Sequence, residues 1–480
     1  MAKFIYFSIC SLFVLTHVLS AQTTSIPDSN FEQSLIDQGI DSDGILNGKV
    51  LTSDVSSITY LDVSGNDISQ LTGIQDFINL SELHCQENLL TSLTLDKNTK
   101  LEVLNCSENQ LPSLSVKDLT GLRILKCSRN KISELNVSDN ELLEEFHCDH
   151  NLLSTLNLKS NLELTFLNCS NNQFNVLNIT FNWRLKYFDF SFNLLKDIDL
   201  SNCVKLEYMD GSNNPLTSVF LNNMTELEKI YLSENKSLTY IDFSHNHNLE
   251  KIVCHDNESL TKINLSATLA LRYLDCSNNS LTQLQILYNP LLENLYCDKN
   301  QITELDLSQN TNLAFLKCND NQLEFLDLKN GSNNLMTGGV TDYDDQLVYL
   351  DGMDASNNPA LVCIQVDNEL DAGLGLPPYD TWMKDEDASY SENCDANLGV
   401  EEQLLSKSIQ IFPNPAKDII TVASDNLQIE KILIYSVLGR SIREYSSQFD
   451  AMSLNTMSPG LYIMRIHTEK GLAFKRFIKK

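Results

Sequence analysis

Cysteine recurs along this chain at a fixed interval of 21 or 22 residues, and an asparagine follows each of these cysteines three residues later. The nine cysteines form two runs, which are Cys85, Cys106, Cys127, Cys148 and Cys169, and then Cys254, Cys276, Cys297 and Cys318. The surrounding pattern is L-x-x-L-x-C-x-x-N-x-L-x-x-L-x-L. Because every unit carries the same apolar pattern, the units must stack to bury it, and this restricts the chain to a solenoid.

Asparagine marks the repeat more completely than cysteine does, and fourteen copies can be followed from Asn66 to Asn358. This pattern is typical of leucine-rich repeats, in which one short strand per repeat builds a curved parallel sheet. A parallel β-helix is the alternative. The fixed asparagine favours leucine-rich repeats, because it can hydrogen-bond the buried backbone of each turn. We predict a mainly β protein with about fourteen repeats of 21–22 residues over residues 58–366.

The repeated cysteines are expected to be core packing residues. Adjacent strands of a sheet lie about 4.8 Å apart, whereas the Cβ atoms of a disulfide lie about 3.8 Å apart, so a ladder of disulfides would be strained. No pair has the short C-x-x-C spacing of a zinc site. A free buried cysteine behaves as a small apolar side chain, and this is the interpretation we favour over redox or metal chemistry.

The N-terminal end of the array is expected to be processed and capped. Residues 1–21 combine an apolar run with small residues at a cleavage point, as in a secretory signal peptide. Residues 22–57 predict a cap with a short helix that begins at Asp28. The segment Asp41-Ser42-Asp43-Gly44 resembles the start of a calcium loop but lacks the downstream glutamate, so a turn is favoured over calcium binding.

The C-terminal end of the array is interrupted before it closes. Residues 329–346 are rich in Gly, Asn and Asp and predict an excursion loop. A C-terminal cap is expected at residues 367–394, followed by a polar linker at 395–408. Cys363 and Cys394 lie outside the ladder, and in an exported protein such a pair is expected to form a disulfide.

Charge is distributed unevenly along the chain. The whole sequence carries a net charge of −30, residues 409–480 hold ten basic and six acidic residues, and residues 1–21 hold one lysine, so residues 22–408 carry −35. An acidic array of this kind repels phosphate backbones, which excludes nucleic acid as a ligand. No apolar run reaches 18 residues, so no transmembrane segment is expected in the mature chain.

Residues 409–480 have the pattern of a separate small β-sandwich. Strand-like runs are expected at residues 409–412, 419–423, 431–435, 441–445, 461–467 and 473–478. About 70 residues are just enough for one independent core.

The same residues resemble the type A C-terminal sorting domain of the type IX secretion system of Bacteroidota. The residues that carry the resemblance are Pro413, Asn414 and Pro415 of the opening motif, Gly439 of the central turn, Gly460 and Tyr462 of the later strand, and the basic end Lys479 and Lys480. The repeats are similar to the cysteine-ladder leucine-rich repeats of internalin-like surface proteins. Together these resemblances imply export by the signal peptide and then by the tail, with the type IX secretion machinery as a partner and a product that is secreted or lies at the outer cell surface.

A non-enzymatic binding or adhesion protein is the function that the sequence favours. The alternatives are a structural surface-layer component and, less favoured, a hydrolase-associated accessory protein. We expect no catalytic residues, no cofactor and no metal site. The histidines near the ladder are His147, His150, His245, His247 and His255, and we expect them to be solvated.

The binding face is expected on the concave side of the sheet, where a protein or glycan ligand would lie. Strand residues four and six positions before each asparagine alternate with inward leucine and cysteine, so they should point outward. The candidate ligand-binding residues are Phe166, Tyr187, Asp189, Tyr208, Asp210, Tyr231, Tyr273 and Asp275. Exposed aromatics beside carboxylates offer apolar faces and directional hydrogen bonds, although strands also favour aromatics for their own packing.

Overall fold

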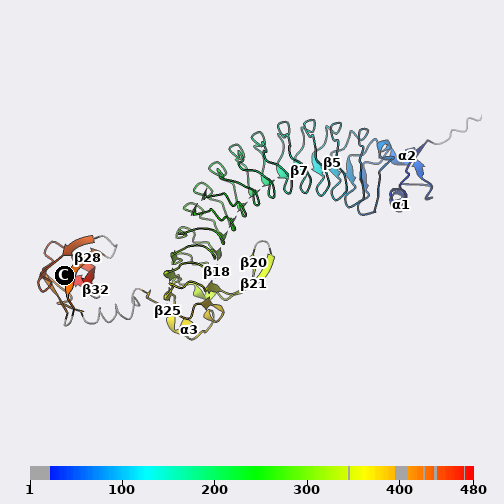
Figure 1. Cartoon of the computed structure of the whole chain (residues 1–480). Helices are drawn as coiled ribbons and strands as arrows, with labels where there is room; N and C mark the ends of the chain where they lie inside the picture. Colours follow the sequence, from blue (N-terminus) through cyan, green and yellow to red (C-terminus); the bar gives the residue numbers. More distant parts are fainter. Residues whose placement is uncertain (1–21, 344–345, 395–408, 425–426, 437–440, 470) are drawn as a thin grey trace, which may run out of the picture. The chain divides into compact units, whose positions relative to one another are not determined.

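The computed structural model describes residues 22–480 apart from 344–345, 395–408, 425–426, 437–440 and 470 (Figure 1). The expected signal peptide, linker and Gly439 lie outside these residues. The chain divides into two units, Met1–Asn300 and Gln301–Lys480. Within the described ranges the helices are α1 (Ser29–Asp37), α2 (Thr52–Val55), α3 (Glu369–Gly373) and three 3-10 turns, η1 (Ile74–Asp76), η2 (Asn333–Leu335) and η3 (Tyr379–Thr381).

The N-terminal cap consists of α1, α2 and an antiparallel pair of strands, β1 (Thr23–Ser25) and β2 (Lys49–Leu51). Asp28 is the N-cap of α1 as expected, because its Oδ1 accepts hydrogen bonds from the backbone of Asn30 and Phe31. Phe31 is fully buried and stacks on Phe77, with ring centroids 6.3 Å apart. The cap therefore covers the apolar end of the first coil.

The acidic segment after α1 forms a turn. The Oδ1 of Asp43 accepts a hydrogen bond of 2.8 Å from the backbone of Ile45, and its Oδ2 accepts one of 3.1 Å from Asn47. Asp43 is thus engaged in the kind of backbone contact that aspartate makes in turns.

The first unit is built around a parallel sheet in which each coil supplies one strand of three residues. In sheet order the strands are β3 (Tyr60–Asp62), β4 (Glu82–His84), β5 (Val103–Asn105), β6 (Ile124–Lys126), β7 (Glu145–His147), β8 (Phe166–Asn168), β9 (Tyr187–Asp189), β10 (Tyr208–Asp210), β11 (Lys229–Tyr231), β13 (Lys251–Val253), β15 (Tyr273–Asp275) and β16 (Asn294–Tyr296). A separate parallel pair is formed by β12 (Tyr240–Asp242) and β14 (Lys262–Asn264). In Figure 1 the coils of this unit follow an arc, and the long sheet lines its inner, concave side. The leucine-rich-repeat fold predicted from the sequence is confirmed.

The repeated asparagine holds successive coils together. Asn172 is typical: its Nδ2 donates to the backbone oxygens of Cys148, Cys169 and Ser170, and its Oδ1 accepts from the backbone of Leu153. The residue before the asparagine has a left-handed φ, which is 53° at Asn171. This conformation is unfavourable outside glycine, and the asparagine offsets it by satisfying the backbone groups of the turn.

A second asparagine ladder lies ten or eleven residues after the first and was not anticipated from the sequence. Its members in the first unit are Asn98, Asn140, Asn161, Asn182, Asn246 and Asn289, and all of them are fully buried. Asn161, for example, donates to the backbone oxygens of Val137 and Asn140 in the preceding coil. The coils are therefore tied at two places by side-chain amides, with apolar residues between them.

The ladder cysteines are buried and free, as expected. Burial raises the pKa of the Cys106 thiol to about 12, so it stays protonated and acts as an apolar group. Cys203 is also buried and free, but it lies in the second asparagine ladder, ten residues after Asn193.

The second unit continues the repeat and ends in a cap. One parallel sheet has the order β17 (Glu304–Asp306), β19 (Phe325–Asp327), β23 (Cys363–Gln365) and β25 (Ser389–Ser391), and β18 (Phe315–Lys317), β22 (Met353–Ala355) and β24 (Met383–Lys384) also pair in parallel. Cys363 and Cys394 form the expected disulfide, with their Cα atoms 5.7 Å apart. The Nε1 of Trp382 donates to the backbone oxygen of Met336 and fixes the cap to the segment that follows η2.

A β-hairpin begins within the segment expected to be an excursion loop, residues 329–346, and extends beyond it to Leu350. Its strands are β20 (Gly339–Tyr343) and β21 (Gln346–Leu350). The hairpin leaves the repeat where Gly352 passes so close to Met336 that an added Cβ would lie 1.9 Å from the Met336 oxygen. Glycine at this position is therefore required by the crossing of the two chain segments.

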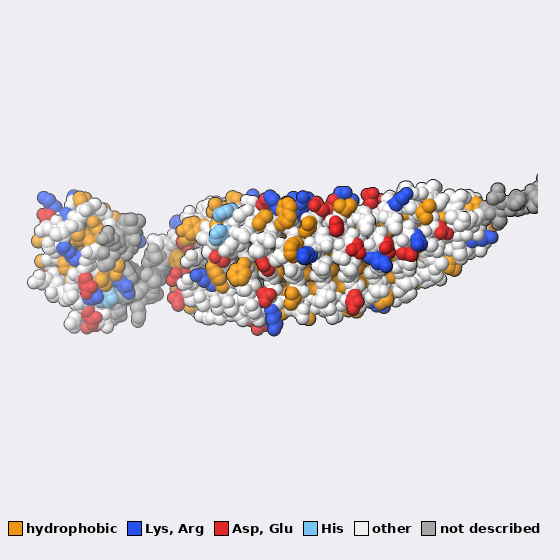
Figure 2. All heavy atoms as spheres, turned by 90° about the horizontal axis from the view of Figure 1, so that it is seen from above, with side chains coloured by type: hydrophobic (Ala, Val, Ile, Leu, Met, Phe, Trp, Pro, Cys, Tyr) orange, Lys and Arg blue, Asp and Glu red, His pale blue; other side chains and the backbone are white. Residues whose placement is uncertain are grey.

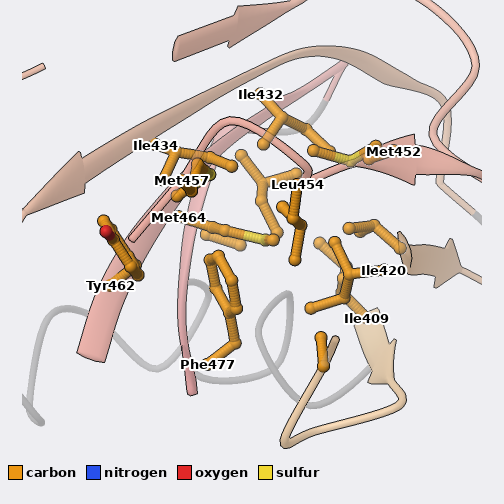
Figure 3. Packing of buried hydrophobic residues seen from close by; sticks show 14 residues of the cluster. Ile409, Ile420, Ile432, Ile434, Met452, Leu454, Met457, Tyr462, Met464 and Phe477 are labelled. Carbon is orange, nitrogen blue, oxygen red and sulfur yellow. The ribbon is translucent and has the colours of Figure 1, made fainter. Parts of the chain in front are cut away.

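The C-terminal residues form the predicted small sandwich of antiparallel strands. One sheet contains β26 (Ile409–Phe412), β27 (Ile419–Ser424) and β30 (Met452–Ser453), and the other has the order β29 (Ser441–Tyr445), β28 (Ile429–Ser436), β31 (Gly460–Thr468) and β32 (Gly471–Lys479). Figure 3 shows Ile420, Ile432, Met464 and Phe477 packed in the core between them. All six strands expected from the sequence are present, and only the short β30 was missed.

Candidate functional site

The concave face of the first unit displays the residues at both ends of each short strand. The middle residues, such as Leu167, Phe188 and Met209, are fully buried in the core. Because side chains alternate along a strand, the first and last residues point to the opposite face. Neighbouring strands pair in register, for example Tyr208 with Tyr187, so each position forms a row along the sheet.

Aromatic rings from five neighbouring strands form a continuous stack, in which Phe166, Tyr187 and Tyr208 are the first residues of their strands and His147 and Tyr231 the last. The ring centroids of Phe166 and Tyr187 are 4.1 Å apart at an interplanar angle of 5°, and those of Tyr187 and Tyr208 are 4.3 Å apart at 7°. His147 stacks on the free side of Phe166 at 4.4 Å, and Tyr231 lies tilted against Tyr208 at 5.5 Å. These five residues are called the aromatic ribbon below.

A lysine extends the aromatic ribbon beyond Tyr231. The Nζ of Lys251 lies 5.3 Å from the centroid of the Tyr231 ring and 4.8 Å from that of Tyr273, and the side chain is only 9% exposed. Tyr273 in turn lies 5.4 Å from Tyr296. Lys251 therefore lies between two aromatic groups and joins them by cation–π contacts.

Two carboxylates lie beside the ribbon on adjacent strands. Asp189 accepts hydrogen bonds from the backbone and the hydroxyl of Ser191, at 3.0 and 2.7 Å, and Asp210 accepts one of 2.9 Å from the backbone of Ser212. The pKa of Asp189 is raised, chiefly by burial and further by the charge of Asp149. The face therefore holds partly buried negative charge next to neutral rings.

The hydroxyls of Tyr187 and Tyr208 remain protonated at neutral pH. Burial, together with the charges of Asp189 and Asp210, raises the pKa of Tyr187 to about 12. Burial and the charge of Asp210 also raise the pKa of Tyr208. Both hydroxyls are thus available as hydrogen-bonding groups without charge.

The expectation that all eight candidate residues are exposed is wrong for three of them. Tyr231 and Tyr273 are 7% and 6% exposed, and Asp275 is fully buried. The two tyrosines are covered by their stacking partners and by Lys251, which sequence alternation cannot reveal. Phe166, Tyr187, Asp189, Tyr208 and Asp210 are partly exposed and lie together on β8, β9 and β10.

Two of the histidines are packed on this face and are not solvated as expected. His147 belongs to the ribbon, and its Nε2 lies 2.8 Å from Glu145, whose carboxylate also lies 2.7 Å from the Nζ of Lys126. His255 lies 2.6 Å from Asp256 and is mostly covered. His150, His245 and His247 are involved only in local contacts at the surface. Within the described ranges there is no group of three or more His, Cys, Asp or Glu side chains able to hold a metal ion.

The opening motif of the tail is bound to the last strand of the chain. The Nδ2 of Asn414 donates to the backbone oxygen of Arg476, and its Oδ1 accepts from the backbone of Ile478. Ala416 exchanges backbone hydrogen bonds of 2.8 Å with Ile478 and Lys480. The asparagine between Pro413 and Pro415 therefore acts as an additional pair of backbone groups at the edge of β32.

The other motif residues have structural positions in the sandwich. Tyr462 is 8% exposed, stacks on Phe477 at 5.6 Å and donates its hydroxyl to the backbone oxygen of Ser458. Gly460 begins β31 opposite Lys479, the last residue of β32. Lys479 is largely buried, whereas Lys480 is exposed.

Comparison with known proteins supports both halves of this description. Residues 410–480 match the family described as secretion system C-terminal sorting domain. An internalin of Listeria monocytogenes, InlF, has a similar structure, with a TM-score of 0.53, 19% sequence identity, and coverage of 78% of this chain and 99% of that one. The functional domain of InlJ from the same organism, described as including a cysteine ladder, matches with a TM-score of 0.48 and 22% identity over 96% of this chain and 99% of that one.

The likeness to InlF shows the leucine-rich-repeat fold of the chain, and the tail is a type IX secretion sorting domain. No curated protein matches the chain. None of the helices in the described ranges has the length and hydropathy that a membrane span requires. The protein is thus a leucine-rich-repeat protein with a sorting tail that implies export to the cell surface.

Proposed function

We propose that this protein is a non-enzymatic binding or adhesion protein, which presents the concave face of its repeats to a protein or glycan ligand after type IX export. The observation that supports the proposal best is the aromatic ribbon with Asp189 and Asp210 beside it on β9 and β10. Large rigid aromatic groups with adjacent hydrogen-bonding groups are the usual composition of binding surfaces.

A structural surface-layer component is the second candidate. Apolar residues outside the strands, such as Val176, Trp183 and Phe220, are 72%, 48% and 73% exposed, and they would suit contacts between copies. Figure 2, which looks down on the molecule from above the view of Figure 1, shows several hydrophobic side chains among the charged ones on the face that it displays. The net charge of −30 opposes close packing of identical molecules, so we favour the binding protein.

Substitution within the ribbon tests the proposal. The capture of surface proteins and glycans would be compared between the purified parent protein and the double variant Tyr187→Ala/Tyr208→Ala. The control is Trp183→Ala/Phe220→Ala, which removes two aromatic side chains elsewhere on the protein. Loss of an anchoring aromatic typically weakens binding by about 1 to 2 kcal/mol, or roughly five- to thirtyfold. A third variant, Tyr187→Phe/Tyr208→Phe, should keep the stack, since Phe166 already occupies the same row.

The proposal fails if every ligand is bound as tightly by the Tyr187→Ala/Tyr208→Ala variant as by the parent. It also fails if the parent binds no ligand and instead associates with itself. Circular dichroism of each variant confirms that the comparison is made between folded proteins.

A further inference from the structure

We propose that the hairpin formed by β20 and β21 is a second docking site, which binds an extended segment of a partner protein in which apolar residues alternate with basic ones. The segment adds to the edge of the hairpin as a further β-strand. This inference goes beyond the proposed function, since it concerns a different surface from the concave face of the first unit.

The hairpin is an insertion that the stacking of the coils does not need. Asn321 and Asn358 are 37 residues apart, whereas the other neighbouring asparagines of the first ladder are 21 or 22 residues apart. The sheet nevertheless continues across the insertion, because β18 pairs directly with β22 in parallel. The pairing of the last coils therefore does not depend on the hairpin.

The base of the hairpin is fixed, while its strands project from the coils of the second unit (Figure 1). Just beyond β21, the backbone of Gly352 donates to the Oγ1 of Thr381 at 3.2 Å, and the Met336 oxygen that Gly352 passes accepts from the Nε1 of Trp382 at 2.9 Å. Among the described residues, β20 and β21 pair only with each other. The hairpin is thus an arm presented from a firm base.

The outer edges of the hairpin favour addition of a strand. Each strand of an isolated antiparallel pair leaves alternate backbone N–H and C=O groups unpaired along its outer edge, and such a pair is only marginally stable in water. Proteins often protect an exposed edge with proline or lysine. Neither residue occurs in β20, which reads Gly-Val-Thr-Asp-Tyr, or in β21, which reads Gln-Leu-Val-Tyr-Leu. These edges suit an extended peptide as the occupant.

One face of the hairpin exposes three apolar side chains. Val340 pairs in register with Tyr349, and Leu347 lies two residues before Tyr349, so all three point to the same side of the hairpin. Val340 and Tyr349 are each 67% exposed, and Leu347 is 81% exposed. Because side chains alternate along a strand, a partner strand that covers this face needs an apolar residue at every second position.

The charge of the hairpin favours a basic partner over a second copy of the chain. Residues 338–352 contain four aspartates and neither lysine nor arginine, so the segment carries a net charge of −4. Two such hairpins repel each other when they pair edge to edge, whereas a strand with basic residues between its apolar ones is attracted. The occupant is therefore a basic strand of another protein.

Two matched pairs of substitutions and one replacement test the inference in the full chain. Val340→Thr/Leu347→Thr removes two exposed apolar side chains from the hairpin and leaves every charge in place. The control is Leu370→Thr/Leu374→Thr, because these leucines are 68% and 65% exposed, on α3 and at its C-cap. A third variant replaces residues 339–350 by a turn of two glycines and so removes the hairpin. Circular dichroism confirms that each variant is folded.

The probes are end-blocked peptides of about eight residues, which is within the usual length of a strand. The first alternates valine with lysine, and the second has glutamate in place of lysine. Two further versions of the valine–lysine peptide are N-methylated, one on every valine and the other on every lysine. Because successive N–H groups of a strand point to opposite sides, only one of these versions blocks the side that pairs with the hairpin.

We expect the valine–lysine peptide to bind the parent protein and the glutamate peptide to bind at least about tenfold more weakly. Val340→Thr/Leu347→Thr should weaken binding by about five- to tenfold and loss of the hairpin should abolish it, whereas Leu370→Thr/Leu374→Thr should change it by less than about twofold. One N-methylated version should lose binding and the other should keep it. Fluorescence anisotropy at physiological salt gives the affinities, because screening suppresses attraction to the rest of the acidic chain.

Equal binding by the parent and by the variant without the hairpin would overturn the inference, since it would assign the binding to overall charge. Equal weakening by the two threonine pairs, or equal effects of the two N-methylations, would exclude strand addition at the apolar face. The inference is also wrong if the valine–lysine peptide does not bind, or if the glutamate peptide binds as tightly.

Sedimentation tests the remaining occupant. A parent that dimerises, with a monomeric variant that lacks the hairpin, would assign the hairpin to a second copy and overturn the inference. Ligand capture at the concave face is measured separately with Tyr187→Ala/Tyr208→Ala, so this inference and the proposed function can fail independently.

Discussion

Replacing one ladder asparagine by alanine should destabilise the repeat by an amount that the hydrogen bonds allow us to work out. Asn193 lies in the middle of the first unit and is 5% exposed. Its Nδ2 donates to the backbone oxygens of Cys169, Phe190 and Ser191 at 3.0 to 3.1 Å, and its Oδ1 accepts from the backbone of Phe174 at 3.0 Å. The side chain thus joins two neighbouring coils.

The carbonyl groups would not be left without donors in Asn193→Ala. Cys169 still receives the Nδ2 of Asn172, Phe190 that of Asn214, and Ser191 the backbone N–H of Asn171. The group that loses its acceptor is the buried N–H of Phe174. An orphaned buried donor costs about 1 to 3 kcal/mol, and this is the destabilisation that we expect.

The chain supplies its own control for this experiment. Asn66 occupies the same position in the first repeat, but it is exposed and its Nδ2 donates only to the oxygen of Ser64. Asn66→Ala should therefore change stability by less than about 0.5 kcal/mol.

Urea denaturation would compare the two variants, and hydrogen exchange of the amides near Phe174 would report local opening, since repeat proteins need not unfold in a single step. Equal midpoints for Asn193→Ala and Asn66→Ala, with unchanged exchange near Phe174, would refute the account of the ladder.

Two further predictions concern a buried charge and the tail. Burial raises the pKa of Asp275 above its ordinary value of 3.8, so its ionised form opposes folding. Asp275→Asn should raise the thermal midpoint at pH 7, with a gain that shrinks as the pH falls towards 3.8 and is absent below it; a lower midpoint at pH 7 would contradict this. Deletion of residues 409–480 should cause the protein to accumulate in the periplasm of a host with type IX secretion, as measured by cell fractionation. Undiminished surface display of the deletion variant would contradict the role of the tail.

The sequence was sufficient to predict the repeat fold, because an asparagine at a constant spacing indicates the same turn in each coil of a solenoid. The spacing of the repeated asparagine placed each strand of the long sheet in the first unit, and two off-ladder cysteines were enough to pair Cys363 with Cys394. The second ladder was missed because Leu119, Cys203 and Met224 replace asparagine there, which breaks the pattern that a reader of the sequence would follow.

The candidate site was harder to derive, since alternation tells which way a side chain points but not what covers it. Tyr231 and Tyr273 point out of the core as predicted, and they are nonetheless buried by contacts with Lys251 and with other rings. The depth of a concave face depends on the curvature of the sheet and on the size of neighbouring side chains in the same row. Neither can be read from the spacing of a single repeat.

In-register stacking affects aromatic and acidic rows in opposite ways, and this determines which residues best indicate a ligand. Identical positions on adjacent strands lie about 4.8 Å apart, so rings in a row stabilise one another. The stack of Phe166, Tyr187 and Tyr208 can therefore be explained by folding alone. Carboxylates are affected differently, because burial and the nearby charge of Asp149 disfavour the ionised form of Asp189, which therefore costs stability in the free protein. Residues that oppose folding and are not needed by the core are the stronger evidence for a partner, and Asp189 is a residue of this kind.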